Sequence, residues 1–267
     1  MKVILIFLIF LSYMHARIDM QKKTYMESKA TIYVPFSISE FEIATSLFEN
    51  LFLGNDQVYE QAKLLGLRLI QDKEYIIIVD TQKRGWGFYV IRQGAFTNNL
   101  LSIPHGFFDL GTAQIGYQLM IKNPYRGIAY NTVHRSISDL AHTKYSLFNA
   151  FHKAFALVYK DDYIYQLHGF SNLTRKSETA KNTNAIISTT TLPSKKILRI
   201  SECLNKINYD TLVFGIDVFE LGGTTNSQAA ILRNQGYQNF IHLELNKSFR
   251  EKLISDKLLQ KKVQQCL

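Results

Sequence analysis

Short apolar segments alternate with amphipathic segments along most of this chain, and this alternation restricts its possible folds more than any other feature. Tyr75–Val79 and Tyr163–Leu167 are short and apolar, which is typical of strands. Phe107–Met120 and His142–Tyr159 carry apolar residues at three- and four-residue steps, which is typical of helices. The pattern predicts an α/β fold with a mixed central sheet and helices on both faces. We see no internal repeat and expect residues 31–267 to form one domain.

Other segments complete this expected order of elements. Ser37 and Glu40 form a capping-box pattern, which predicts that a helix starts there. The polar turn 80–86 predicts a β-hairpin, and Gly169–Asn184 is expected to be a long surface loop. The other expected strands are Thr31–Phe36, Leu67–Ile70, Gly87–Ile91, Leu100–Pro104, Arg126–Tyr130, Ala185–Thr190, Thr211–Ile216 and Phe240–Leu245. The other expected helices are Asp56–Leu65, Leu192–Ile207 and Asn246–Gln265.

The N-terminal residues have the pattern of an export signal. Lys2 precedes the apolar run Val3–Leu11, and the small residue Ala16 follows it, as in a secretory signal peptide. The run is too short to span a bilayer as a helix. We expect residues 1–16 to be a signal peptide, 17–30 a flexible leader, and the mature chain to lack a transmembrane segment. These features predict a secreted or periplasmic protein; the alternative is a buried N-terminal helix or strand.

Charge and cysteine content leave several partners open. The formal net charge is +9, which suits a soluble basic protein or one that binds an anionic cell-wall polymer, nucleic acid or membrane surface. Aromatic and basic residues are not interleaved, so we expect no nucleic-acid partner. The clearest basic cluster lies in the last expected helix, at Lys252, Lys257, Lys261 and Lys262.

The only cysteines are Cys203 and Cys266. They could form a disulfide in an exported chain, and the sequence leaves this pairing open.

Three residues could form a metal site. His105 follows the apolar strand Leu100–Pro104, and Asp109 comes four residues later, so both side chains can face one cation. His168 follows another expected strand. Two histidines, one carboxylate and an open position form a common catalytic zinc site. The structural alternatives are a helix cap for Asp109 and packed loop positions for both histidines.

Between these candidates lie residues that could bind a substrate. Arg135 could hold a substrate carboxylate or a developing oxyanion, or it could form an ion pair with Asp139. Asp139 could orient a ligand histidine or cap the next helix, and His142 could contact the substrate or bind the metal. His134 is expected to support the site rather than ligate.

A late strand and a glycine-rich loop add further candidates. Glu244 lies in an apolar strand, where an unpaired charge is costly to bury. It therefore faces solvent together with His242, or it faces a polar pocket and acts as a general base. Thr225 and Asn226 follow Gly222-Gly223 and are expected to contact the substrate, or to form a plain turn.

The order of these motifs resembles a known group of hydrolases. It runs Pro-His-x-x-x-Asp at 104–109, Arg…Asp-Leu-x-His at 135–142, Leu-His-Gly at 167–169 and Glu-Leu-Asn-x-x-x-Arg at 244–250. It resembles N-formylglutamate amidohydrolases and the broader zinc carboxypeptidase and aspartoacylase-like fold. The resemblance implies a mixed sheet, one zinc ion and hydrolysis of an amide or peptide bond.

The resemblance also assigns roles. It implies that His105, Asp109 and His168 are zinc ligands, that Glu244 is the catalytic base and that Arg135 polarises the substrate. Asp139 begins a motif that in the family contacts the substrate carboxylate. This chain departs from the family in two places: the carboxypeptidase acid follows its histidine by three residues, where Phe108 stands here, and Ala141-His142 replace Asn-Arg.

We therefore expect an exported, zinc-dependent hydrolase of an amide or peptide bond. Its substrate would be a small peptide or an acylated amino acid, cell-wall derived or otherwise, and the basic charge suits an anionic one. The alternative is a non-catalytic secreted binding protein or an effector that retains the fold.

Overall fold

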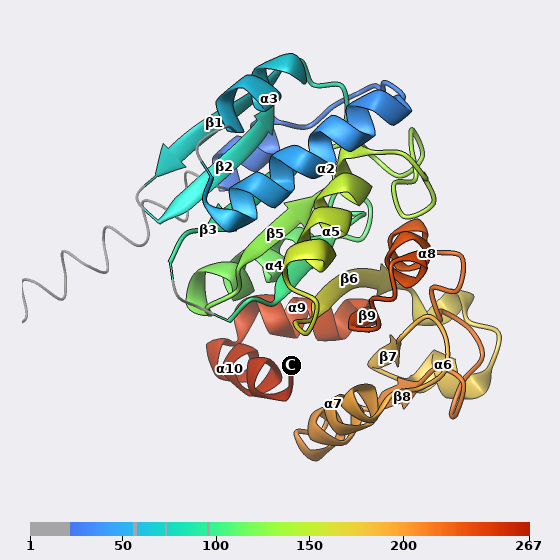
Figure 1. Ribbon diagram of the computed structural model, residues 1–267. Helices are drawn as coiled ribbons and strands as arrows, with labels where there is room; N and C mark the ends of the chain where they lie inside the picture. Colours follow the sequence, from blue (N-terminus) through green and yellow to red (C-terminus); the bar gives the residue numbers. More distant parts are fainter. Residues whose placement is uncertain (1–21, 56–57, 73, 95–96) are drawn as a thin grey trace, which may run out of the picture.

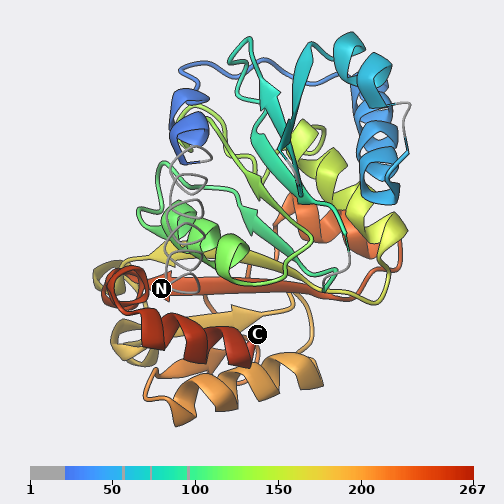
Figure 2. The same cartoon turned by 90° about the vertical axis from the view of Figure 1, so that its left-hand side faces the viewer.

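A nine-stranded mixed sheet forms the centre of the molecule (Figure 1). The computed structural model describes residues 22–55, 58–72, 74–94 and 97–267. The strands lie in the order β1-β2-β3-β5-β4-β6-β9-β7-β8. Helices cover both faces of this sheet, as the 90° view in Figure 2 also shows. The predicted α/β class with a mixed central sheet is confirmed.

The strands are β1 (Leu67–Asp72), β2 (Tyr75–Asp80), β3 (Phe88–Arg92), β4 (Leu100–Ile103), β5 (Gly127–Tyr130), β6 (Ile164–Phe170), β7 (Ala185–Ser188), β8 (Thr211–Val213) and β9 (Phe240–Asn246). The helices are α2 (Ile38–Leu53), α3 (Val58–Leu64), α4 (Thr112–Lys122), α5 (Leu147–Val158), the 3₁₀ turn η1 (Asn172–Thr174), α6 (Glu178–Asn182), α7 (Lys195–Lys206), α8 (Ser227–Asn234), α9 (Lys247–Ser255) and α10 (Lys257–Cys266).

The four inner strands run parallel, which determines where the candidate residues meet. β4 pairs in parallel with β5 and with β6, and β6 pairs in parallel with β9. β1, β2 and β3 add antiparallel pairs at one edge, including the predicted hairpin. At the other edge, β7 is antiparallel to β9. The carboxyl ends of β4, β6 and β9 therefore lie together, which is where α/β sheets place their ligands.

Each face of the sheet carries its own hydrophobic core. On one face, α2 and α5 lie side by side (Figure 1), and their aromatic rings interlock. Phe48 and Phe151, for example, pack edge to face with ring centroids 4.8 Å apart. On the other face, α4, α7, α9 and α10 pack against the alternate strand residues, such as Leu167 and Leu243. Both faces of the inner strands are buried, which explains why these strands are apolar rather than alternating.

Some element boundaries differ from those predicted. Residues 31–36 form no strand, because in this segment only Val34 makes a backbone bond to a neighbouring segment, from its N–H to the carbonyl of Arg84. The helix expected from Phe107 starts only at Thr112, after a turn in which Gly111 has a φ of 94°. The expected final helix is two helices, because Asp256 ends α9 and its carboxylate accepts from backbone N–H groups of α10. Residues 169–184 contain η1 and α6 rather than a plain loop.

The expected leader is ordered where the structure describes it. Residues 22–27 are helical, and Ala30 forms a β-bridge with Val133. Tyr25 is buried, and its ring stacks on Phe107 with centroids 4.9 Å apart. The prediction of a flexible leader is therefore wrong for residues 22–30, because their aromatic side chain packs into the core. The expected signal peptide, 1–16, lies outside the described residues. In the described ranges, no helix combines the length and apolar character that a membrane span requires.

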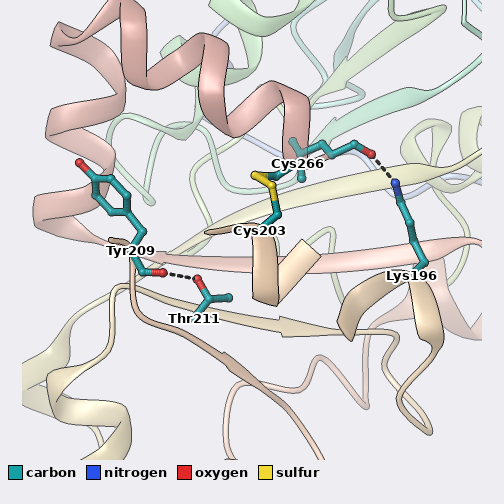
Figure 3. The surroundings of a disulfide bond; sticks show 6 residues. Lys196, Cys203, Tyr209, Thr211 and Cys266 are labelled. Atoms are coloured by element: carbon teal, nitrogen blue, oxygen red, sulfur yellow. Dashed lines mark hydrogen bonds between the residues drawn. A yellow bond between two sulfur atoms is a disulfide. The ribbon is translucent and has the colours of Figure 1, made fainter. Parts of the chain in front are cut away.

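A disulfide joins the last helix to the body of the protein. Cys203 of α7 and Cys266 of α10 form this bond, which closes a sequence separation of 63 residues (Figure 3). Beside it, the Lys196 ammonium group donates to the carbonyl of Leu267 at 2.6 Å. The bond decides the pairing that the sequence left open. Disulfides form and persist in oxidising compartments.

Candidate active site

All of the candidate residues except Asp109 and Asp139 line a cleft of about 260 Å³ at the carboxyl ends of the inner strands. His105 follows β4, His168 lies near the end of β6, and Glu244 lies near the end of β9. His168 and Glu244 are direct neighbours in the parallel register of these two strands. The rest of the lining consists of Arg135, Ala141, His142, Leu221, Gly222, Gly223, Thr224, Thr225, Asn226 and His242. The structure therefore brings together residues that are separated by up to 139 positions in the sequence, from His105 to Glu244.

Three expected metal ligands converge on one point. Nδ1 of His105 lies 3.4 Å from Oδ2 of Asp109, and Nδ1 of His168 lies 3.6 Å from the same oxygen. All three residues are buried, and their donor atoms lie within 4.8 Å of one another. The backbone N–H of Gly169 donates to Oδ2 of Asp109 at 3.0 Å and so holds the carboxylate in place.

The second nitrogen of each imidazole has a partner that can only accept a hydrogen bond. Nε2 of His105 lies 2.8 Å from the Asp139 carboxylate, so this nitrogen carries the proton and donates. Nε2 of His168 likewise donates to the Gln166 side-chain carbonyl at 2.9 Å. In the neutral rings, the lone pairs of both Nδ1 atoms therefore face Asp109. Such an outer hydrogen bond is typical of metal-binding histidines.

The electrostatics of this group also suit a cation. The buried Nδ1 of His105 has no hydrogen-bond partner among the described residues. Burial would lower the pKa of His105, but the nearby carboxylates of Asp109 and Asp139 outweigh burial and raise it. Burial likewise would raise the pKa of Asp109, yet the nearby imidazoles of His105 and His168 hold it well below its usual range. The donor set thus fits zinc: two imidazole nitrogens and one carboxylate.

Asp139 holds several side chains in position at once. Its Oδ1 accepts from His105, and its Oδ2 accepts from Nε of Arg135 at 2.9 Å. Nδ1 of His142 lies 3.1 Å from Oδ2 as well. Both oxygens of Asp139 are therefore engaged by neighbouring side chains, and the bond to His105 matches the alternative that Asp139 orients a ligand histidine. Burial would raise the pKa of Asp139, but the bond from His105 and the nearby positive charges keep it below its usual range.

Arg135 and His142 form the half-open side of the cleft. The side chain of Arg135 is 40% exposed and lies over the ring of Phe108. His142 is 45% exposed, and its Nε2 lies 3.0 Å from the hydroxyl of Thr225. Arg135, His142 and Thr225 remain accessible from the cleft. By contrast, the buried Asn226 donates to Gln166 at 2.6 Å and caps α8 through its side-chain carbonyl, so it supports His168 through Gln166.

Glu244 is a buried carboxyl group beside the three donors. Its Oε2 has no hydrogen-bond partner among the described residues, and its Oε1 lies 3.9 Å from Nε2 of His242. Burial, followed by the negative charge of Asp109, raises the pKa of Glu244 to about 8. The sequence left open whether Glu244 faces solvent or a polar pocket, and the structure shows the pocket.

His242 is a residue of the cleft to which the sequence assigned no role. Its ring is buried, and its centroid lies 4.4 Å from that of His168. His168, His242 and Glu244 form a second possible donor set that shares His168 with the first. Side chains two residues apart in a strand point to the same face, so His242 and Glu244 share one face of β9. This spacing is the sequence signal that could have placed His242 in the cleft.

Arg250 fixes the turn that carries Asp109. Its guanidinium donates to the carbonyl of Leu110 at 2.9 Å and to the carbonyl of Leu245 at the end of β9. A side chain at Gly169 would place a Cβ only 2.3 Å from this guanidinium. A glycine is therefore required after His168 for this clamp to form.

Comparisons with known proteins find similarity only among solved structures. No protein-family model and no curated protein sequence matches the chain. The chain is similar in structure to N-formylglutamate amidohydrolase from Ralstonia eutropha JMP134, with 10% identity and a TM-score of 0.48 over 68% of this chain and 95% of that one. It is also similar to an aspartoacylase family protein from Mesorhizobium loti MAFF303099, with 12% identity and a TM-score of 0.41 over 73% and 70%. A third similar structure is the zinc-free form of YNDL, with 13% identity and a TM-score of 0.44 over 67% and 85%.

N-formylglutamate amidohydrolase and aspartoacylase are also the groups that the motif order resembles. At identities of 10–13% and TM-scores below 0.5, these likenesses transfer neither an activity nor a metal to this chain. Its chemistry therefore depends on its own residues.

Proposed function

We propose that this protein is an exported, zinc-dependent hydrolase that cleaves an amide or peptide bond. The observation that supports this most is the convergence of two imidazole Nδ1 atoms on Oδ2 of Asp109, with both Nε2 atoms engaged elsewhere. A buried group of this kind has little structural use without a cation, because it leaves Nδ1 of His105 without a hydrogen-bond partner. His105, Asp109 and His168 would hold the zinc ion. When bound there, zinc would supply a Lewis acid that polarises the scissile carbonyl.

Glu244 is the proposed general base. It takes a proton from the attacking water, whose oxygen forms the new bond to the carbonyl carbon. When the carbon–nitrogen bond breaks, the same carboxyl group passes the proton to the leaving amine. Its burial supports this role, because a carboxyl group with a raised pKa both accepts and releases a proton near neutral pH.

Arg135, His142 and Thr225 are the proposed substrate contacts. Arg135 keeps its guanidinium at the cleft because Asp139 binds Nε, and it would stabilise the negative charge that develops on the carbonyl oxygen. His142 and Thr225 offer a ring nitrogen and a hydroxyl that also remain accessible from the cleft. A small peptide or acylated amino acid matches the cleft volume of about 260 Å³. An anionic substrate, such as a cell-wall fragment, would also suit the net charge of +9.

Export is part of the proposal. It rests on the signal-like residues 1–16 and on the disulfide between Cys203 and Cys266. A secreted or periplasmic location provides the oxidising conditions that this bond requires.

The deciding experiment measures zinc content and activity in the same preparations. Wild-type protein, loaded with zinc and dialysed, should retain about one equivalent by mass spectrometry of the metal, as one donor set requires. It should also hydrolyse members of an N-acyl amino acid and dipeptide panel. His168→Ala should lose both the zinc and the activity. His134→Ala is the matched control, because His134 is paired with Ser136 and lies outside the donor set.

Two outcomes would contradict the proposal. His168→Ala that still binds one equivalent of zinc would overturn the ligand assignment. Wild-type protein that binds no zinc, cleaves nothing in the panel and gains nothing from added zinc would favour the non-catalytic binding protein.

A further inference from the structure

A chain of buried amide side chains connects His168 to helix α8. Gln166 of β6 contacts His168, and two residues at the start of α8, Asn226 and Gln228, contact Gln166. These three amides are at most 2% exposed. A buried amide has to satisfy both its N–H donors and its carbonyl acceptor, so its neighbours decide which way it faces.

The Gln166 amide uses both its acceptor and its donor side. Its carbonyl oxygen accepts from Nε2 of His168 at 2.9 Å and from the amide nitrogen of Asn226 at 2.6 Å. Its own nitrogen donates to the hydroxyl of Ser102 and to the side-chain oxygen of Gln228, both at 3.1 Å. If this amide were turned over, its N–H groups would face those of Asn226 and its oxygen would face that of Gln228. The neighbours therefore allow one orientation.

Two backbone groups fix the orientation of these neighbours in turn. The side-chain oxygen of Asn226 accepts from the backbone N–H of Ala229 at 2.9 Å, which leaves its amide nitrogen facing Gln166. The amide nitrogen of Gln228 donates to the backbone carbonyl of Leu140 at 2.7 Å, which leaves its oxygen facing Gln166. A backbone N–H only donates and a backbone carbonyl only accepts, so neither contact can be reversed. Both anchors impose the same orientation on Gln166.

We propose that Asn226 and Gln228 are positioning residues that select the tautomer of His168 through Gln166. The oriented oxygen of Gln166 requires a proton on Nε2 of His168, which leaves the lone pair on Nδ1. This nitrogen faces Asp109, so the amide chain prepares His168 as a ligand before any cation binds. The zinc part of this inference rests on the proposed function, whereas the tautomer is a property of the metal-free protein.

Long-range ¹H–¹⁵N NMR on the metal-free full chain measures this tautomer directly. At pH 8, above the ordinary histidine pKa of about 6.5, the wild-type spectrum should show His168 with its proton on Nε2. The resonance is identified by its loss in His168→Ala. A wild-type His168 with its proton on Nδ1 would overturn the proposal, and this reading needs neither an activity nor a second variant.

Reversing the two anchors should reverse the tautomer. Asn226→Asp keeps an oxygen for the N–H of Ala229 but presents a second acceptor to Gln166. Gln228→Met removes the acceptor that holds the nitrogen of Gln166. With both substitutions, the Gln166 amide should turn over and donate to Nε2 of His168, which moves the ring proton to Nδ1.

Gln166→Met tests the same chain without adding a charge. It removes the acceptor for Nε2 of His168, so both tautomers should appear in the NMR spectrum. Zinc affinity, measured by competition with a chromogenic chelator, should fall about 10–100-fold, the scale for loss of a partner that orients a ligand.

Gln260→Met is the matched control for Gln166→Met. Gln260 is also a buried amide, but it donates to the carbonyl of Leu253 and lies outside the amide chain. Gln260→Met should lower stability in urea titrations, as Gln166→Met does, yet leave the His168 tautomer and the zinc affinity unchanged.

Three outcomes with folded variants would contradict the proposal. The first is a double variant, Asn226→Asp with Gln228→Met, that retains the proton on Nε2 of His168. The second is a Gln166→Met variant with the wild-type tautomer. The third is an equal fall in zinc affinity in Gln260→Met, which would show a loss of stability alone. A wild type that binds no zinc but has the expected tautomer would sink the proposed function and leave the amide chain in its role.

Discussion

The Asp139 carboxylate accepts a hydrogen bond from Nε2 of His105 at 2.8 Å, on the side of the ring away from Asp109. This bond determines which nitrogen of His105 carries the proton. It therefore turns the lone pair of Nδ1 toward the two other proposed zinc ligands. We therefore propose that Asp139 orients a zinc ligand, and this role can be separated from ligation by experiment.

Asp139→Ala should lower zinc affinity by about 10–100-fold without removing the site, because the three ligands remain but His105 is no longer held in its tautomer. Competition with a chromogenic chelator measures this affinity. Asp139→Asn should have a smaller effect, since the amide oxygen can still accept from Nε2. An Asp139→Ala variant with wild-type zinc affinity would show that the bond does not orient a ligand.

Glu244→Gln should reduce kcat by about 10²–10⁴-fold while leaving bound zinc unchanged, because the amide cannot accept the proton of water. Steady-state kinetics and metal analysis on one preparation measure both quantities. The zinc content decides between the two donor sets. If Glu244→Gln loses zinc as His168→Ala does, then the set of His168, His242 and Glu244 holds the ion, and Glu244 is a ligand rather than the base.

Loss of the disulfide should lower the free energy of unfolding. A bond that closes a separation of 63 residues restricts the unfolded chain, with an upper value of about 4 kcal/mol on the loop-entropy scale. Cys203→Ser should therefore be about 2–4 kcal/mol less stable than the oxidised wild type in urea titrations. Wild type in reductant should match the variant, and a difference between these two would show an effect of the serine itself.

His152 should make stability depend on pH. Burial lowers the pKa of His152 to about 4, whereas a histidine in the unfolded chain titrates near about 6.5. The unfolded state therefore binds more protons between these values, and the free energy of unfolding falls as pH falls through this range. The contribution lost between pH 7.5 and 5 is about 2 kcal/mol.

Urea titrations at the two pH values measure this loss, and His152→Phe is the comparison. The phenyl ring does not titrate, so the variant should lose about 2 kcal/mol less than the wild type over the same interval. Equal losses in both proteins would show that His152 does not cause the dependence.

Local signals predicted the individual elements well. Ser37 and Glu40 form the expected capping box at the start of α2, and the segments around Tyr75 and Phe88 pair as the expected hairpin. These signals are local because caps, turns and apolar periodicity involve residues only a few positions apart. Local signals were less informative at 31–36. This apolar segment is a mostly exposed loop that does not join the sheet.

The sequence by itself determined the α/β class, most of the order of strands and helices, and three polar residues suited to a metal. Only the tertiary structure decided that β6 and β9 are neighbours, which brings Glu244 beside His168 and buries His242 against it. It also decided that Asp139 orients His105 and that residues 22–30 pack against the core. The physical reason is that strand order and side-chain hydrogen bonds join segments far apart in the chain, and the free energy of such contacts has no local signature in the sequence.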